Sequence, residues 1–245
     1  LVDSADQTLS NMGAQLMSKG HIYYNYGLGL QGGLYKAEIP AENFITAGEK
    51  VWAAPDCNLL DQMRDIENKF KDAWGLDFPM QWEVPYDMWH NVILKNKQVR
   101  TWVLENRKLN NQVVVDDMIV TEEMVKEYIG TFDGVSPIVV IEEKQKNEGV
   151  TVHGWKPNVA VLRPLGYAGV IRHTTILDQK MYQKYGSNLI SRVFAKTRDG
   201  ICTVENITIN NGNMREWQTH LLMSATPSLD EFLWHIIVDT TTADT

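Results

Sequence analysis

The residue pattern closest to a known chemical motif is a glycine-rich run near the start of the chain. Residues 27–32 read GLGLQG, which is the spacing of the fingerprint that binds dinucleotides. That fingerprint needs a helix directly after it, because the helix N-terminus faces the pyrophosphate. Here a strand-like run at residues 34–39 follows instead, and Pro40 ends it. We therefore interpret residues 27–33 as the flexible tip of a hairpin rather than as a nucleotide site.

Histidines, cysteines and paired carboxylates are the other side chains that could do chemistry. The six histidines have no Cys, Asp or Glu partner at a metal-ligand spacing on one helical face. Cys57 and Cys202 lie in neither a CxxC motif nor a nucleophile elbow. The carboxylate pairs at residues 116–117 and 142–143 are adjacent, and adjacent residues of a strand point to opposite faces. We predict no catalytic residue, no metal ion and no cofactor.

The composition excludes several classes of protein. The 245 residues include 23 Lys and Arg against 31 Asp and Glu, a net charge of −8, which argues against a chain that mainly grips phosphate. Two cysteines cannot build a disulfide scaffold, and no apolar run approaches the roughly 20 residues of a membrane-spanning helix. The chain starts at Leu1 with neither an initiator Met nor a signal-peptide core, so we expect that the native N-terminus is missing or processed.

The first fifty residues lack a helical period and indicate a long β-hairpin or arm. Strand-like runs at residues 21–26 and 34–39 flank the glycine-rich turn. Tyr23, Tyr24 and Tyr26 lie on this arm. A projecting hairpin cannot cover its own apolar side chains, so we expect a neighbouring subunit to cover them.

Helical patterns follow in the next part of the chain. The strongest is Leu59–Trp74, where apolar residues recur at three- and four-residue steps and Gly75 supplies a left-handed stop. A second helix is predicted from about Tyr86 past Trp102, and a third, short helix from Thr121 to Gly130.

From residue 137 onward the sequence is typical of β structure, apart from one possible helix around residues 178–185. Asp199 and Gly200 sit between two strand-like runs and give the strongest hairpin signal, and residues 211–212 mark another turn. The remaining strands are predicted at residues 138–141, 150–155, 159–162 and 232–238. The fold class is therefore α+β.

The order of these segments resembles the major capsid proteins of tailed phages, specifically the phage lambda E-type family with the Hong Kong 97-like fold. The resemblance runs from about residue 20 to 240 and rests on the order of its parts rather than on one motif. The parts are the arm ending in AEIP at 37–40, GEKVW at 48–52, the helix at 59–74, MWHNVILKNKQV at 88–99, IVVIE at 138–142, KPNVAVLRP at 156–164 with the glycine-rich loop at 165–169, and SATPSL at 224–229.

The resemblance implies a fold with an axial lobe, a peripheral lobe carrying a long spine helix, and an extended N-terminal β-hairpin arm. It divides the chain into a remnant of the N-terminal arm at 1–20, the hairpin arm at 21–50, the peripheral lobe at 51–80 and 196–245, and the axial lobe at 81–195. The assembly arm would use Tyr23, Tyr24, Tyr26, Leu28, Leu30, Gly32 and Gly33. The core of the spine helix would be Leu60, Met63, Ile66, Phe70 and Trp74.

The function that the resemblance implies is mechanical. The chain would be a shell subunit, not an enzyme, that assembles as hexamers and pentamers into an icosahedral capsid around double-stranded DNA. Its partners would be other copies of itself together with scaffold, decoration or portal proteins. Contact with the DNA would be weak and non-specific, and no membrane would be involved. The protein would belong to the virion capsid and would assemble in the host bacterial cytoplasm.

Three alternatives stay open. An encapsulin-type nanocompartment shell would keep the fold and enclose an enzyme instead of a genome. A hydrolase with a carboxylate or Cys nucleophile would need a convergent nucleophile, base and orienting group, for which the sequence offers no convincing spacing. An oligomeric binding module is the third.

Overall fold

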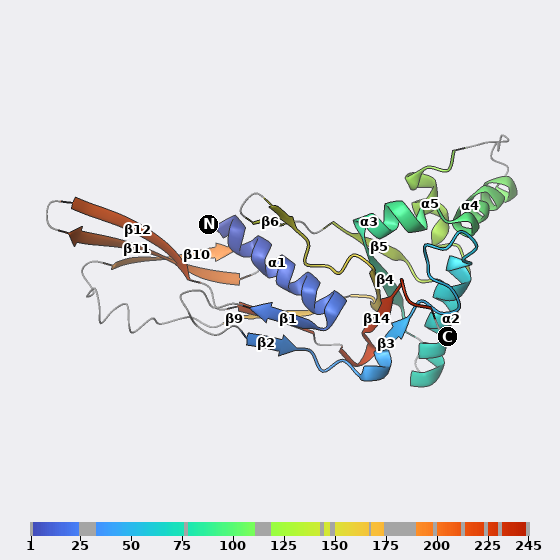
Figure 1. Ribbon diagram of the computed structural model, residues 1–245, viewed down its shortest axis with the longest axis horizontal. Helices are drawn as coiled ribbons and strands as arrows, with labels where there is room; N and C mark the ends of the chain where they lie inside the picture. The colour runs from blue at the N-terminus through green and yellow to red at the C-terminus, as the bar shows by residue number, and fades with distance from the viewer. Residues whose placement is uncertain are drawn as a thin grey trace.

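The computed structural model has an elongated shape, with helices at one end and a long β-sheet at the other (Figure 1). Helix α1 (Val2–Lys19) lies between these ends, beside strands β1 (His21–Tyr24) and β2 (Gly33–Lys36). The structure describes residues 2–24, 33–75, 78–110, 119–142, 145–147, 150–166, 168–173, 190–197, 200–211, 214–222, 225–229 and 232–243.

A five-stranded mixed sheet forms the centre of the fold, in the order β3-β14-β8-β4-β5. β14 runs antiparallel to β8 and parallel to β3, and β4 runs antiparallel to β8 and parallel to β5. The sheet thus joins strands from the early, middle and last parts of the chain. Its strands are β3 (Phe44–Thr46), β4 (Met80–Pro85), β5 (Ile138–Ile141), β8 (Val159–Pro164) and β14 (Ile236–Asp239).

Helix α2 (Leu59–Trp74) covers one face of this sheet and has the predicted bounds. Leu60, Met63, Ile66 and Phe70 are buried there, whereas Trp74 is only partly buried. The helix ends as predicted at Gly75, which has a left-handed φ of 62°.

One hydrophobic cluster joins residues from both of the predicted lobes. Met63 of α2 shares it with Trp82 of β4, Val99 and Val125 of later helices, and Ile236 of β14. The boundaries between an axial and a peripheral lobe stay a prediction.

The helical stretch predicted from about Tyr86 past Trp102 is confirmed only in part, because the structure divides it into two helical segments. Residues 86–93 form α3 (Tyr86–Met88) and a π-helical turn (Trp89–Ile93), and α4 (Lys97–Leu109) then begins anew. Asn96 causes the break. Its extended backbone leaves the helix, and its side chain accepts hydrogen bonds from the first turn of α4. The short helix α5 (Glu122–Ile129) begins after Thr121 as predicted, and the Met124 amide donates to the Thr121 hydroxyl.

The expectation that the first fifty residues contain no helix is wrong, because α1 occupies Val2–Lys19. The helix buries Leu9 and Leu16, and it covers the face of the central sheet opposite α2. It ends at Gly20, whose φ of 71° suits glycine and turns the chain directly into β1.

The other strands form small antiparallel sheets. The hairpin predicted around residues 199–200 and the turn predicted at residues 211–212 are confirmed by the pairing of Thr197 with Gly200 and of Asn211 with Met214. The predicted helix around residues 178–185 lies outside the described residues. The strands are β6 (Gln145–Asn147), β7 (Val150–Val152), β9 (Gly169–His173), β10 (Ile190–Thr197), β11 (Gly200–Asn211), β12 (Met214–Leu222) and β13 (Ala225–Leu229).

The last strand is shorter than predicted. Instead of one strand over residues 232–238, a 3₁₀ turn at Phe232–Trp234 precedes β14. The reason is Asn43, whose side-chain amide donates to the carbonyls of Leu233 and His235 and holds the chain in a turn before the strand. Asn43 itself ends a second 3₁₀ turn, Ala41–Asn43, which leads into β3.

Candidate functional site

The hairpin of β1 and β2 has two different faces. Ile22 is fully buried and pairs across the strands with Tyr35, which packs on the same cluster. Tyr23 pairs with Leu34, and these side chains are 70% and 43% exposed. Because side chains alternate along a strand, one face anchors the hairpin and the other presents an apolar pair to solvent.

The base of the hairpin is attached firmly to α1. The Gly20 amide donates to the Leu16 carbonyl at 2.9 Å, and the Ala37 amide donates to the Gly20 carbonyl at 2.9 Å. A Cβ atom at Gly20 would lie 3.0 Å from the Phe44 ring, so the aromatic ring packs where a larger residue would not fit. The contacts of Gly20 with α1 and with the Phe44 ring therefore fix the direction of the hairpin, and no pattern in the sequence indicates them.

The predicted arm residues are placed only in part. Tyr23 and Tyr24 lie in β1, and Gly33 begins β2, where it pairs with Tyr24. Tyr26, Leu28, Leu30 and Gly32 lie outside the described residues. Their role in an assembly arm stays a prediction.

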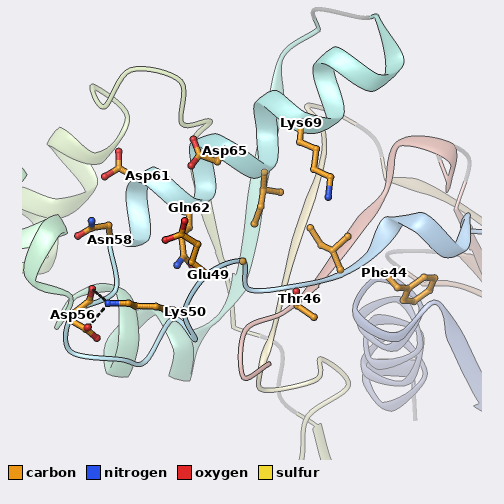
Figure 2. Close-up of a pocket in the computed structure, with 13 residues that line it drawn as sticks. Phe44, Thr46, Glu49, Lys50, Asp56, Asn58, Asp61, Gln62, Asp65 and Lys69 are labelled. Carbon is orange, nitrogen blue, oxygen red and sulfur yellow. Dashed lines mark hydrogen bonds and ion pairs between the residues drawn. The ribbon is translucent and has the colours of Figure 1, made fainter. Parts of the chain in front are cut away.

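A groove of about 550 Å³ lies between β3 with its following loop and the outer side of α2 (Figure 2). Lys50 and Asp56 form an ion pair at one end of it, and Asp61 binds Arg64 at 2.7 Å. The hydrogen bond to Asp56 raises the pKa of Lys50, so this ammonium group stays charged. The residues that line the groove are Phe44, Ile45, Thr46, Gly48, Glu49, Lys50, Asp56, Asn58, Asp61, Gln62, Asp65, Ile66 and Lys69, with no His or Cys among them.

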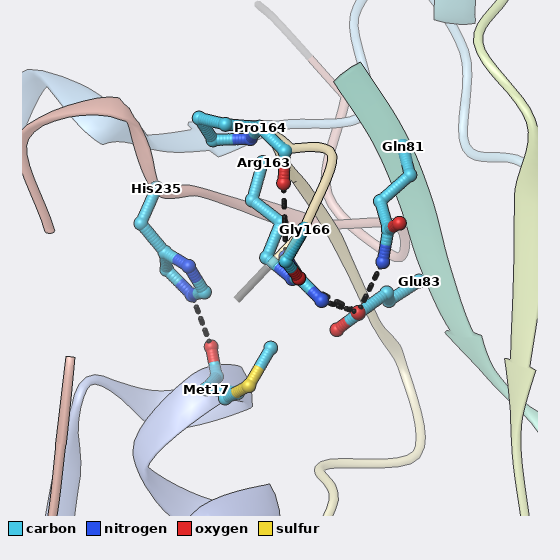
Figure 3. A network of polar contacts seen from close by, with 7 residues as sticks. All are labelled: Met17, Gln81, Glu83, Arg163, Pro164, Gly166 and His235. Carbon is cyan, nitrogen blue, oxygen red and sulfur yellow. Dashed lines mark hydrogen bonds and ion pairs between the residues drawn. The ribbon is translucent and has the colours of Figure 1, made fainter. Parts of the chain in front are cut away.

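Buried charged side chains form a polar network around Arg163 (Figure 3). Its guanidinium donates to one carboxylate oxygen of Glu83 at 2.6 and 2.9 Å and to the carbonyls of Pro164 and Gly166 at 2.9 Å. Gln81 donates to the same Glu83 oxygen at 2.7 Å. This arrangement ties β4 to β8 and to the loop after it, which is a structural use of the charges.

His235 belongs to the neighbouring part of the core. Its Nε2 lies 2.7 Å from the Met17 carbonyl near the end of α1 (Figure 3). Burial lowers the pKa of His235 to about 4, so the ring is neutral at pH 7 and Nε2 carries the proton that it donates. The contact links β14 to α1.

Cys57 is the one cysteine whose side chain the structure describes, and it is buried without a disulfide. Burial raises the pKa of its thiol, which is the opposite of what a nucleophilic cysteine needs. In the described part of the chain, no group of three or more His, Cys, Asp or Glu side chains could hold a metal ion. No helix there is both long and apolar enough to span a membrane.

Comparison with known proteins gives information on the fold. No protein-family model and no curated protein sequence matches the chain. The crystal structure of the putative capsid protein of a prophage from E. coli CFT073 matches 97% of this chain with a TM-score of 0.60 and 14% identity. The fold is phage capsid-like. The chain spans 63% of that protein's own length.

A second structure, a phage-related protein from Bordetella bronchiseptica RB50, is similar at a TM-score of 0.43 and 13% identity. The similarity covers 82% of this chain and 56% of the other.

Proposed function

We propose that this chain is a structural subunit of a tailed-phage or prophage capsid. The observation that carries the proposal is the fold, which matches the putative capsid protein of a prophage over 97% of the chain. In its finer form the proposal is a lambda E-type subunit that assembles as hexamers and pentamers into an icosahedral shell around double-stranded DNA. Such a protein is a component of the virion and assembles in the cytoplasm of the host.

The hairpin supports an assembly role. Tyr23 and Leu34 expose an apolar pair on an arm whose other face is fixed to the core. A subunit gains stability by covering such a pair with a neighbour. In head-to-tail rings each subunit gives one surface and receives another, so the arm of every copy can be covered in the same way.

The charge of the chain supports the role of a container. With a net charge of −8, the subunit has no electrostatic drive to hold DNA tightly, which suits a shell that must fill with DNA and release it. Scaffold, decoration and portal proteins are the further partners that this role requires.

Negative-stain electron microscopy of the expressed protein, alone and with a scaffold, tests the proposal. We expect rings or closed shells, and a protein that stays monomeric under all conditions would refute it. The double variant Tyr23→Ser, Leu34→Ser should remain folded by circular dichroism and lose assembly. The matched control is Leu109→Ser, Ile119→Ser, because these side chains are each 78% exposed and belong to the end of α4 and to the segment before α5 rather than to the hairpin.

The content of purified shells separates the proposal from the encapsulin-type alternative. Shells that carry nucleic acid and depend on a portal support the capsid role. Shells filled with one enzyme would support the nanocompartment instead. The hydrolase alternative has less support, because the buried Arg163 network and Cys57 have structural environments.

A further inference from the structure

Helix α4, at the helical end of the molecule (Figure 1), carries its cations on one face. Five of its residues follow one another at steps of three or four positions, so their side chains lie together along the helix. The residues of this basic face are Lys97, Arg100, Leu104, Arg107 and Lys108. The helix buries a different face, with Val99 and Val103 in the core. The basic face is thus left to meet something other than the core.

The charges of this face are not neutralised within the described part of the chain. Lys97, Arg100 and Lys108 are exposed, and Arg107 is partly buried with a buried Nε that has no hydrogen-bond partner there. None of the four cations forms an ion pair with a described residue. The cations that do form ion pairs are Lys50, Arg64, Lys71, Lys126, Lys156 and Arg163.

The stability of the helix explains only half of this face. Arg107 and Lys108 lie in the last turn, where a positive charge is favourable to the helix dipole. Lys97 and Arg100 lie in the first turn, where a positive charge is unfavourable, and the first turn of α4 has no acidic residue. Helices α2 and α5 both begin with acidic residues instead. The two cations at the start of α4 therefore call for a role outside the helix.

We propose that the basic face of α4 binds the phosphate backbone of double-stranded DNA without reading its sequence. The proposal rests on the proposed function, in which the subunit encloses DNA, and it names the surface that contacts the DNA.

The face suits a DNA backbone better than a protein surface. From Lys97 to Lys108 it extends about 16 Å, at about 1.5 Å for each residue. B-DNA of that length carries about ten phosphate charges, more than enough for four cations. The core of a protein–protein interface is apolar and depleted of lysine, whereas the exposed side chains of this face are cations. Lys and Arg contacts with phosphate carry no sequence information, so DNA of any sequence should bind.

The rest of the subunit keeps this contact weak. The chain has a net charge of −8, although α4 has four cations against one carboxylate, Glu105. Glu105 lines a pocket with Trp102 and Phe132. A local basic face on an acidic subunit binds DNA at low salt and releases it as salt screens the charges. This behaviour agrees with a shell that must fill with DNA and release it.

The test measures binding of the full chain to fluorescein-labelled duplexes of about 30 base pairs, which are longer than the face. Fluorescence anisotropy is recorded between about 20 and 200 mM salt, at concentrations where sedimentation shows single subunits. Two duplexes of unrelated sequence are compared. A glutamate decapeptide serves as the competing acidic protein segment. Electron microscopy of the same preparations, under assembly conditions, reports separately on shell formation.

The variant Lys97→Gln, Arg100→Gln, Lys108→Gln removes three exposed cations of the face. Its matched control is Lys36→Gln, Lys69→Gln, Lys126→Gln, which removes the same charge at exposed positions on other elements. Both variants should unfold at nearly the wild-type urea midpoint, because exposed positions contribute little to stability.

We expect the wild type to bind both duplexes equally, with a Kd of about 10–100 μM at about 50 mM salt. The α4 variant should bind at least about tenfold more weakly, and the slope of log K against log salt should become shallower by about 2–3, close to one for each lost phosphate contact. The control variant should keep the wild-type slope and bind within about threefold of the wild type.

Several outcomes would overturn the inference. An equal loss in the control variant would mean that total charge, rather than α4, governs binding. Displacement of the DNA by the glutamate decapeptide at an equal concentration of charges would identify an acidic protein segment as the ligand. No binding up to about 0.1 mM protein at low salt would remove the site. Shells that form without such binding would overturn this inference and leave the proposed function standing. Binding through α4 by a chain that never assembles would refute the proposed function instead.

Discussion

Replacing Glu67 on α2 should destabilise the fold strongly, because its carboxylate is a buried acceptor of several hydrogen bonds. Its side chain is only 1% exposed, and one carboxylate oxygen accepts hydrogen bonds from the Trp82 indole and the Ser136 amide, both at 2.7 Å. The other oxygen accepts from the Ser136 hydroxyl at 2.7 Å. Glu67 therefore fastens α2 to β4 and to the segment that leads into β5.

The contacts give the expected size of the effect. In Glu67→Ala, the indole of Trp82 and the amide of Ser136 lose their acceptor inside the core, at a cost of about 1–3 kcal/mol for each buried donor. We expect a total loss of about 4 kcal/mol. Glu67→Gln keeps one oxygen for the two N–H donors, but it loses the charge and the oxygen that accepts from the Ser136 hydroxyl, so about 1–2 kcal/mol is expected.

Urea unfolding followed by tryptophan fluorescence measures both variants. It is done at concentrations where the midpoint does not depend on protein concentration, because assembly would add apparent stability. For a chain of this size, a loss of about 4 kcal/mol lowers Tm by roughly 8–16 °C. Asn68→Ala, at the exposed neighbouring position, is the control and should stay within about 0.5 kcal/mol of wild type. A loss below about 1 kcal/mol for Glu67→Ala, or a larger loss for Gln than for Ala, would refute the reasoning.

Two further predictions concern pH and helix capping. The pKa of His235 is lowered to about 4 in the folded protein, so the unfolded chain takes up the proton first as the pH falls. Stability should fall by up to about 3 kcal/mol between pH 6.5 and 4, and chemical unfolding of His235→Gln should show a flatter pH profile. Asn96→Ala removes the acceptor of the Gln98 and Val99 amides and should cost about 1–2 kcal/mol in the same unfolding assay, with no pH dependence.

Helix α2 could be predicted from the sequence because the side chains that it buries form a single apolar face. Its apolar residues recur at helical spacing, and Gly75 stops the helix with a backbone that other residues rarely adopt. The hairpin around residues 199–200 and the turn at residues 211–212 were predictable for a similar reason, since turn chemistry acts within a few residues.

Helix α1 could not be predicted in the same way, because polar residues occupy part of its buried face. Asn11 and Ser18 are buried there together with Leu9 and Leu16, so the hydrophobic period is weak. What fixes the helix is distant in sequence. The Lys156 amide donates to the Ser18 hydroxyl at 2.9 Å.

The break before α4 follows from a side chain that makes hydrogen bonds in two directions. Asn96 caps α4 and also donates to the Cys57 carbonyl at 3.0 Å. The second bond ties the start of α4 to the chain before α2, and sequence spacing alone does not reveal such a contact. Local helical propensity on both sides of Asn96 therefore suggested one helix where the fold has two.

The arm and the groove were predictable to different degrees. The tyrosines and the glycine-rich turn indicated a hairpin, but only the pairing shows that Tyr23 and Leu34 share its exposed face. The groove is lined by residues 44–50 and 56–69, which come together because β3 pairs with β14 near the other end of the chain. The sequence of neither segment alone predicts that the two lie side by side.

The central strands did contain a signal for the missing helix. Ala160 and Leu162 of β8 pack in the cluster of α2, while Val159 and Val161 pack in the cluster of α1. A strand that is apolar at every position is buried on both faces, so the sheet needs two covering layers. The helices predicted from the sequence cover one face of the sheet. The other face must be covered by a segment for which no packing partner is predicted. Residues 1–20 were such a segment. The hairpin packs with α1 on one face of the sheet, and α2 packs on the other. A second subunit that covered the hairpin would therefore bind on the α1 side of the sheet.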